Sequence, residues 1–184
     1  SGHIPGGASI FMEVEGKKLL YTADINTEDT NLMVPSNIDH IRDIDILITE
    51  NTYGDRPHPS REDCEEGLID SIYTCMRGGG SALIPVFSVG RSQEILILLS
   101  RLDPTIPIYF DGMARKITKL VLESDDPYID NRETLERMFK RVHIIEKRTE
   151  REQIAKKKGV VIVSTSGMVQ GGPVLSYLSE MWHN

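Results

Sequence analysis

From residue 78 onward, short apolar runs alternate with segments of helical periodicity, and this alternation constrains the fold more than any other feature of the sequence. Apolar runs of strand length occupy residues 82–86, 106–110, 142–145 and 160–163. Helical patterns lie at residues 92–102, 113–122, 149–158 and 173–182. Because strands joined by helical crossovers pair in parallel, the pattern predicts an α/β fold with a mostly parallel sheet covered by helices on both faces.

The first third of the chain predicts strands that are close in sequence. Apolar residues alternate with others in residues 8–15, and a Gly-Lys-Lys turn separates this stretch from a second run at residues 19–24. Such a pattern is typical of a β-hairpin. Residues 45–50 form a short apolar run that ends in polar residues, which predicts a buried strand.

A helix is predicted between these strands and the alternating region. Ser60 is its expected N-cap, with Asp63 at the capping-box position, and three glycines from Gly78 end it. Apolar residues recur along it at four-residue spacing: Cys64, Leu68, Ile72 and Met76. Cys64 and Cys75 lie about 16 Å apart on this helix, too far for a disulfide, so we expect both to pack against neighbours.

Charge excludes one class of function. The 184 residues include 28 acidic and 21 basic side chains, a net charge of −7, which excludes a nucleic-acid binder with a basic surface all round. Residues 111–158 are locally basic, with 13 basic and 10 acidic side chains. The lysines and arginines of residues 147–158 either follow an RNA backbone or form a solvated helix face with i,i+4 ion pairs. No apolar run reaches the length of a membrane span.

Polar residues collect where the predicted strands end. They are Asp24, Glu50, Ser88, Arg91, Asp111 and residues 164–168. Ligands of parallel sheets bind beyond the carboxyl ends of the strands, and Gly-rich turns that enter a helix leave N–H groups for a phosphate. For one such turn, plain capping chemistry is the better explanation, but several at one sheet edge favour a binding site. Arg91 has a second explanation, a salt bridge to Glu94 or another acid.

A metal is suggested only weakly by residue spacing. His3 lies in a Gly-rich loop before the first strand, and Asp24 follows at a strand end about twenty residues later. Imidazole and carboxylate together can bind a cation, but a catalytic zinc needs at least three protein ligands.

Six short segments contain these candidates. They read GHIPGGA at residues 2–8, YTAD at 21–24, TENTYG at 49–54, PVFSVGRSQE at 85–94, YFDGMAR at 109–115 and TSGMVQGG at 165–172. In this order they resemble the motifs of the β-CASP branch of the metallo-β-lactamase superfamily, which contains RNA-processing nucleases. The family includes the endonuclease subunit of the cleavage and polyadenylation specificity factor and ribonuclease J. The first two segments resemble zinc motifs, the third resembles motif A, with Asn51 where Ser is commoner, and the others resemble β-CASP blocks.

The resemblance also implies what the chain does not contain. The family's His-x-His-x-Asp-His motif is expected before residue 1, and its histidine motifs B and C after residue 184. We therefore expect an internal part of a larger enzyme. Residues 1–55 would be the end of the first metallo-β-lactamase half, of αββα type, and residues 56–184 an incomplete β-CASP domain with a mostly parallel sheet flanked by helices.

The resemblance implies a mechanism for the full-length protein. Two zinc ions would activate a hydroxide that attacks an RNA phosphodiester in 3′-end processing or decay, with His3 as a ligand of one ion and Asp24 bridging both. Glu50 would orient the general-acid histidine of motif B. Hydroxyls, a guanidinium and free N–H groups suit phosphate, so we expect an RNA-facing wall formed by Ser88, Arg91, Ser166 and Gly167.

Two alternatives remain open. One is a non-catalytic β-CASP scaffold subunit of an RNA-processing complex, and the other is a DNA-directed β-CASP nuclease. The expected partner is single-stranded RNA, with a homodimer of the full-length protein left open, no membrane association, and a prokaryotic cytoplasmic location. Because most zinc ligands are expected elsewhere, the chain alone should bind zinc poorly and should not cut RNA.

Overall fold

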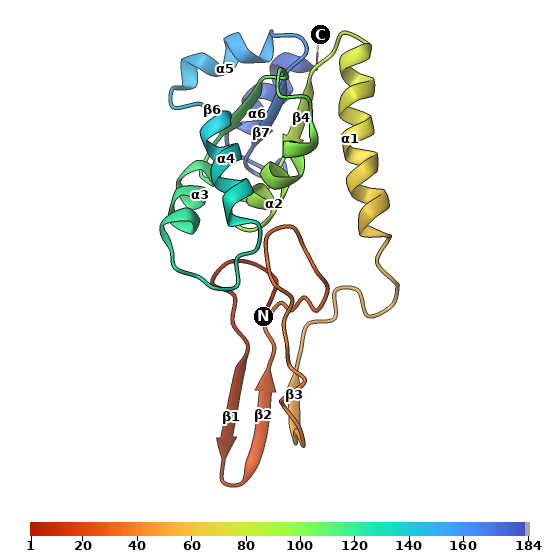
Figure 1. Cartoon of the computed structure of the whole chain (residues 1–184), viewed down its shortest axis with the longest axis vertical. Coiled ribbons are helices and arrows are strands. Elements are labelled where there is room, and N and C mark those ends of the chain that lie inside the picture. Colours follow the sequence, from red (N-terminus) through yellow and green to blue (C-terminus); the bar gives the residue numbers. More distant parts are fainter. Residues whose placement is uncertain (183–184) are drawn as a thin grey trace.

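A computed structural model describes residues 1–182 and shows two sheets surrounded unequally by helices (Figure 1). The strands are β1 (Ile10–Val14), β2 (Lys17–Tyr21), β3 (Ile46–Ile48), β4 (Ala82–Pro85), β5 (Ile108–Asp111), β6 (His143–Ile144) and β7 (Val161–Ser164). The α-helices are α1 (Arg61–Arg77), α2 (Arg91–Leu98), α3 (Ala114–Glu123), α4 (Arg132–Arg141), α5 (Arg148–Ala155) and α6 (Val174–Met181), and a 3₁₀ turn, η1 (Leu99–Arg101), follows α2. None of the helices within residues 1–182 is both long and apolar enough to cross a bilayer.

The N-terminal sheet consists of β1, β2 and β3 in that order. β1 and β2 form the expected antiparallel hairpin, with Ile10 paired to Tyr21, and β3 lies parallel to β2. The prediction of a buried strand at residues 45–50 was wrong in its burial. All three residues of β3 are exposed, as are all five of β1, because no described element covers either face of this sheet along those strands.

The C-terminal sheet has the order β4-β7-β5-β6, and all its pairings are parallel. This confirms the predicted α/β fold with a parallel sheet between helices. The first three strands form a separate sheet, because β1 and β3 each pair only with β2.

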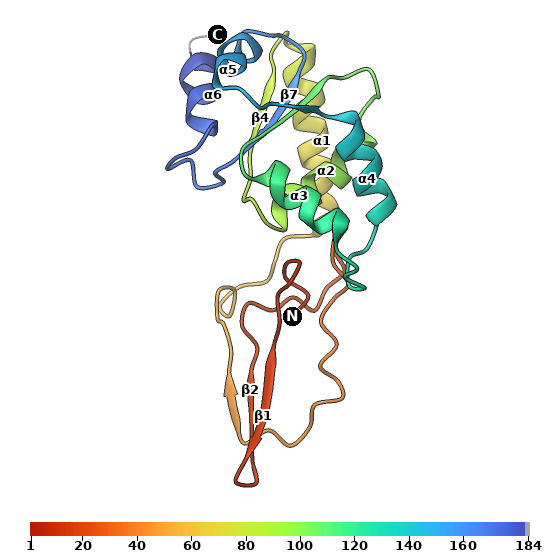
Figure 2. The same cartoon turned by 90° about the vertical axis from the view of Figure 1, so that its left-hand side faces the viewer.

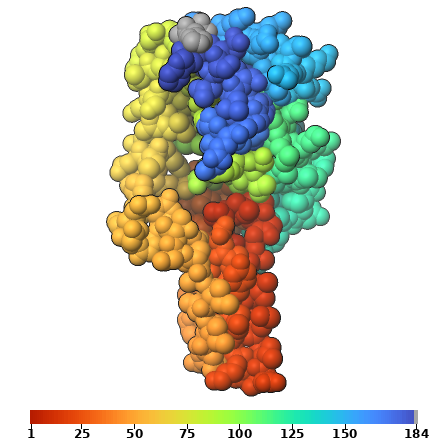
Figure 3. Space-filling model, turned by 180° about the vertical axis from the view of Figure 1, so that it is seen from behind, coloured from red at the N-terminus to blue at the C-terminus, as the bar shows by residue number. Residues whose placement is uncertain are grey.

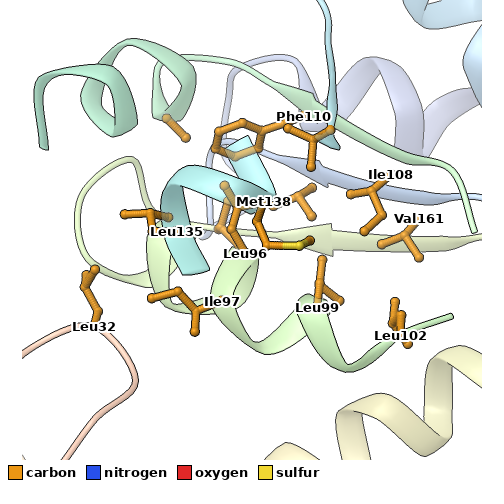
Figure 4. Close-up of a cluster of buried hydrophobic side chains, with 14 of the residues drawn as sticks. Leu32, Leu96, Ile97, Leu99, Leu102, Ile108, Phe110, Leu135, Met138 and Val161 are labelled. Atoms are coloured by element: carbon orange, nitrogen blue, oxygen red, sulfur yellow. The ribbon is translucent and has the colours of Figure 1, made fainter. Parts of the chain in front are cut away.

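Side chains alternate between the two faces of the C-terminal sheet. Ile108 and Phe110 of β5 and Val161 and Val163 of β7 join the larger core, together with residues of α1, α2, α3 and α4 (Figure 4). Ile162, between the two valines, points to the other face and packs with residues of α5 and α6. Figure 2 shows these two helices on one side of the sheet and the other four on the opposite side.

Two details of the helices differ from prediction. α1 begins as expected, with the Ser60 hydroxyl accepting a hydrogen bond from the Asp63 N–H, but Cys64 is exposed because the first turn of the helix extends past the core. α4 was not predicted, although Leu135 and Met138 are both buried. Their three-residue spacing is a helical signal, diluted by the charged residues of the segment.

A loop from the N-terminal part of the chain is inserted into the larger core. Leu32 and Met33 are buried there, and Met33 forms an isolated antiparallel bridge with Ile129. The Asp130 N–H donates to the Leu32 carbonyl at 2.7 Å. This loop therefore attaches the N-terminal sheet to the helices α2, α3 and α4.

A polar cluster supports the same attachment. The Glu94 carboxylate, almost fully buried, accepts hydrogen bonds from the Asn31 N–H at 2.9 Å and the Asn31 side-chain amide at 3.0 Å. Arg61 of α1 pairs with the same carboxylate and, at 3.0 Å, with Glu65. The loop backbone is thus held by two helices through one buried acid.

The carboxyl ends of β2 and β3 face the carboxyl ends of the strands of the C-terminal sheet. In Figure 1, β2 runs upward toward the helices, whereas α1 carries the chain to the far end of the molecule, where β4 begins and runs back. The other strands of the C-terminal sheet are parallel to β4. The loops that follow β2 and β3 therefore face the loops that follow the strands of the C-terminal sheet, and the candidate residues lie between them.

Candidate active site

The loops after the N-terminal sheet bring His3 and Asp24 together. The His3 Nε2 and Asp24 Oδ2 atoms are 4.0 Å apart, and both side chains are accessible to solvent. The ends of β2 and β3 are joined by a hydrogen bond of 3.0 Å between the hydroxyls of Thr22 and Thr49. The sequence-predicted pair thus lies at one place, although the two residues are 21 positions apart.

Glu50 connects the same loops. One carboxylate oxygen accepts from the Ile25 N–H at 3.0 Å, and the other accepts from the Thr52 hydroxyl at 2.6 Å. The Thr52 hydroxyl, and next the Ile25 N–H, hold the pKa of this carboxyl below its usual value. Glu50 is therefore an ionised hydrogen-bond acceptor beside Asp24.

The donor chemistry of His3 and Asp24 fits a metal ion. Imidazole nitrogen and carboxylate oxygen bind zinc at about 2.0–2.2 Å, so two ligand atoms of a tetrahedral site lie roughly 3.4 Å apart. The His3 Nε2 and Asp24 Oδ2 atoms, 4.0 Å apart, would need to approach only slightly to reach this separation. Within residues 1–182 no group of three or more His, Cys, Asp or Glu residues is arranged to hold a metal. Two such residues are fewer than the three protein ligands of a catalytic zinc site.

The loop after β4 contains Ser88 and Arg91. The Ser88 carbonyl is capped by the Ser92 hydroxyl at 3.0 Å, which fixes the entry into α2. Among the described residues, no group accepts a hydrogen bond from the backbone N–H groups of residues 87–90. The Arg91 side chain is exposed and forms no ion pair with any residue in the range 1–182, so the alternative of a salt bridge to Glu94 was wrong.

Gly90 joins this loop to the histidine loop. Its φ is +75°, and a Cβ at this position would lie only 2.5 Å from Cγ2 of Ile4. Glycine is thus required both by the backbone conformation and by the close approach. Because Ile4 follows His3, the contact places the α2 N-terminus next to the histidine loop.

The loop after β7 contains Ser166 and Gly167. The Ser166 hydroxyl donates to the Gly171 carbonyl at 3.2 Å, so it is committed within its own loop. The Gly167 N–H has no acceptor among the described residues, and its backbone packs on Val86 and Phe87. Gly167 therefore suits a phosphate better than Ser166 does. Figure 3 shows the segment around residue 167 above the one around residue 88, which adjoins the N-terminal segment.

Asp111 lies inside the protein, where its carboxylate is hydrogen-bonded to other residues of the chain. It is fully buried, and its carboxylate accepts from Arg151 Nε at 2.7 Å, the Tyr177 hydroxyl at 2.9 Å and the Gly112 N–H at 2.6 Å. Sequence reasoning placed Asp111 at a strand end but missed its partners, which come from α5 and α6. We call Asp111, Arg151 and Tyr177 the buried triad.

Tyr177 gives the buried triad a pH dependence. Burial, and next the Asp111 carboxylate, raise the pKa of its hydroxyl far above the usual value of about 10. A raised pKa in the folded state contributes stability that is complete below pH ~10 and is lost as the pH rises further. In urea titrations between pH 9 and 11, we expect the free energy of unfolding to fall less steeply for Tyr177→Phe than for the wild type. Equal slopes would contradict this assignment.

The basic stretch does not show the predicted ion pairs. Arg151 pairs with Asp111, but no i,i+4 ion pair forms within α5 and its flanks among residues 147–158. Lys157 instead lies 5.9 Å from the ring centroid of Tyr109, which stacks on His143 at 5.1 Å. The alternative of a paired helix face is therefore not supported by the contacts.

Comparison with known proteins finds relatives along the whole chain. A family model described as the Beta-Casp domain matches residues 92–184. A probable RNase of Methanocaldococcus jannaschii is 44% identical over all of this chain and 44% of its own length. An RNase of Saccharolobus solfataricus is 35% identical over all of this chain and 37% of its own. Cleavage and polyadenylation specificity factor 73 of Drosophila melanogaster is 30% identical over 99% of this chain and 28% of its own. The chain thus spans less than half the length of these relatives.

Proposed function

Because the chain belongs to the β-CASP family of metallo-β-lactamase-fold RNA nucleases, we propose that the full-length protein is a zinc-dependent ribonuclease. It would hydrolyse phosphodiester bonds of single-stranded RNA in 3′-end processing or decay. Relatives named as RNases and as a cleavage and polyadenylation factor support this substrate class.

One observation carries the proposal. The His3–Asp24 pair lies at the carboxyl end of one sheet, and the free N–H groups of residues 87–90 and of Gly167 lie at the facing end of the other. Ile4 and Gly90 touch across the junction. The proposed metal ligands and the proposed phosphate-binding groups would thus meet, which supports the hydrolysis of a phosphodiester.

The residues of this chain would have three roles in the reaction: binding the metal, orienting the general acid and binding the RNA. His3 and Asp24 would hold zinc, which when bound lowers the pKa of water and stabilises charge on the attacking and leaving oxygens. Glu50, ionised and held by Thr52, would accept a hydrogen bond from a histidine and orient it as a general acid. Ser88, Arg91, Ser166 and Gly167 would face the RNA, with Arg91 supplying the positive charge.

The remaining assignments are also part of the proposal. Residues 1–55 would be the C-terminal part of the first metallo-β-lactamase half, and residues 56–184 a β-CASP domain that is incomplete at its C-terminal end. The full-length protein would act in the cytoplasm, in keeping with its archaeal relatives, and could work as a homodimer.

The proposal is tested by replacing the metal pair in the full-length protein. We expect His3→Ala and Asp24→Ala each to lower zinc affinity by at least about tenfold and to remove most cleavage of labelled single-stranded RNA. His143→Ala is a matched control, because that exposed histidine stacks on Tyr109 away from the loops of the site. Zinc content by mass spectrometry separates loss of metal from loss of activity.

Parallel measurements distinguish the other hypotheses. A wild-type protein without stoichiometric metal or cleavage would indicate a scaffold subunit, and preferential cleavage of DNA would indicate a DNA-directed nuclease. Residues 1–184 alone should show neither tight zinc binding nor cleavage, because no group of three or more possible ligands forms among the described residues 1–182. Metal-dependent cleavage by this part alone would overturn the assignment.

A further inference from the structure

Three large apolar side chains are exposed at the edge of the C-terminal sheet that faces the site. Phe87 follows β4, Met168 follows β7 and Met113 follows β5, on three neighbouring strands. Their exposed fractions are 52%, 62% and 63%. Side chains of this size are thus exposed on three loops at the same end of the sheet, among residues that are otherwise mostly polar or glycine.

The backbone around Phe87 is firmly held. The Val86 N–H donates to the Ser164 carbonyl at 3.0 Å, which continues the pairing of β4 with β7. A Cβ on Gly167 would lie 3.1 Å from the Phe87 nitrogen and 3.3 Å from Cδ2 of its ring. The Gly167 backbone therefore packs against the ring, which leaves an aromatic surface fixed in place and open to solvent.

Groups that suit phosphate follow Phe87 in the same loop. Ser88 is the next residue, Arg91 lies four positions on with an unpaired guanidinium among residues 1–182, and the N–H groups of residues 87–90 have no described acceptor. A protein–protein interface would have few such charged and unsatisfied polar groups at its centre. An aromatic ring beside phosphate-binding groups is the arrangement that proteins use for single-stranded nucleic acid, whose bases have free faces for stacking.

We propose that Phe87 is a base-stacking platform that positions the RNA strand, with Met168 bordering the same base. This inference rests on the proposed function and adds a subsite to it. While Arg91 and the loop N–H groups bind the backbone, the Phe87 ring supports a base without reading its identity, because every base offers a π-face. Through the Gly90–Ile4 contact, the stacked nucleotide would lie close to the His3–Asp24 pair.

The test measures RNA binding by the full-length protein after its metal has been removed, because removal of the metal prevents cleavage of the RNA. The probe is a single-stranded oligonucleotide that contains 2-aminopurine, whose fluorescence falls when it stacks. We expect Phe87→Ala to weaken binding roughly tenfold and to abolish the fluorescence decrease at one probe position, whereas Phe87→Trp retains both. Leu120→Ala is the control, because Leu120 is 61% exposed on α3 and borders no strand end.

The outcomes separate the two proposals. If Phe87→Ala binds like the wild type while Arg91→Ala binds weakly, the RNA site exists but Phe87 is not its platform, and this inference fails alone. If the wild type does not bind single-stranded RNA, the proposed function fails as well. If Phe87→Ala does not fold, Phe87→Trp and Phe87→Leu decide: retention by Trp with loss by Leu supports stacking, and equal behaviour overturns it.

Discussion

Replacing Asp111 with alanine is expected to destabilise the chain by about 3–5 kcal/mol, the range for removing one partner of a buried ion pair. The substitution leaves the Arg151 guanidinium without its carboxylate and removes the acceptor of the buried Tyr177 hydroxyl. The Asp111 carboxylate also caps the Gly112 N–H. The first two of these interactions connect β5 to α5 and α6, so the core around Ile162, between the sheet and these two helices, should loosen first.

Urea denaturation followed by circular dichroism measures this effect. The matched control is Glu136→Ala, which removes the partner of Lys140 in an ion pair of 2.5 Å with both side chains more than half exposed. Exposed pairs contribute about 0–1 kcal/mol, so this variant should unfold almost like the wild type. A difference of less than 1 kcal/mol between the two variants would show that the buried triad is not a major source of stability.

Replacing Leu32 with alanine is expected to cost about 2–5 kcal/mol, the range for Leu→Ala in a core. Leu32 is 1% exposed, yet it belongs to a loop whose flanking residues are mostly solvent-accessible. Its side chain fills the larger core formed by the C-terminal sheet and its helices. The expected loss therefore includes the attachment of the N-terminal sheet as well as the cavity.

The control for Leu32 is Val34→Ala, two residues further and 41% exposed. Both variants shorten an apolar side chain in the same loop, but only Leu32 reaches the core, so only Leu32→Ala should lower the urea midpoint strongly. Limited proteolysis adds a second measurement, because a detached loop should be cut within residues 25–45 before the helices are. Similar midpoints for both variants would mean that the loop is not anchored by Leu32.

Most of the fold could be predicted from local patterns. The hairpin, the Ser60 cap and the alternation after Gly78 were read correctly, because each depends on neighbours in sequence. The assignment of β3 to a buried strand failed, since burial depends on what covers a strand and not on its own composition. α4 was missed because seven of its ten residues are polar or charged, which hides the few that pack inward.

The sequence predicted which residues are candidates for the site better than it predicted how the two sheets that carry them are arranged. Asp24, Glu50, Ser88 and Arg91 were predicted from their places after strands, because ligands of parallel sheets bind there, and His3 from the Gly-rich loop before β1. That the ends belong to two sheets facing each other is a long-range property without a local signal. The same is true of Asp111, whose partners lie 40 and 66 residues away, and which therefore resembled a ligand-facing acid.

The contact between Ile4 and Gly90 has a consequence for protein engineering. A Cβ at Gly90 would lie only 2.5 Å from Cγ2 of Ile4, so neither the loop of Ile4 nor the loop of Gly90 can be rebuilt without a compensating change in the other. A chimaera that takes only residues 85–94 from a relative would pack that segment against the original residues 1–9, which are not matched to it. Grafts meant to alter specificity should transfer residues 1–9 and 85–94 as one cassette.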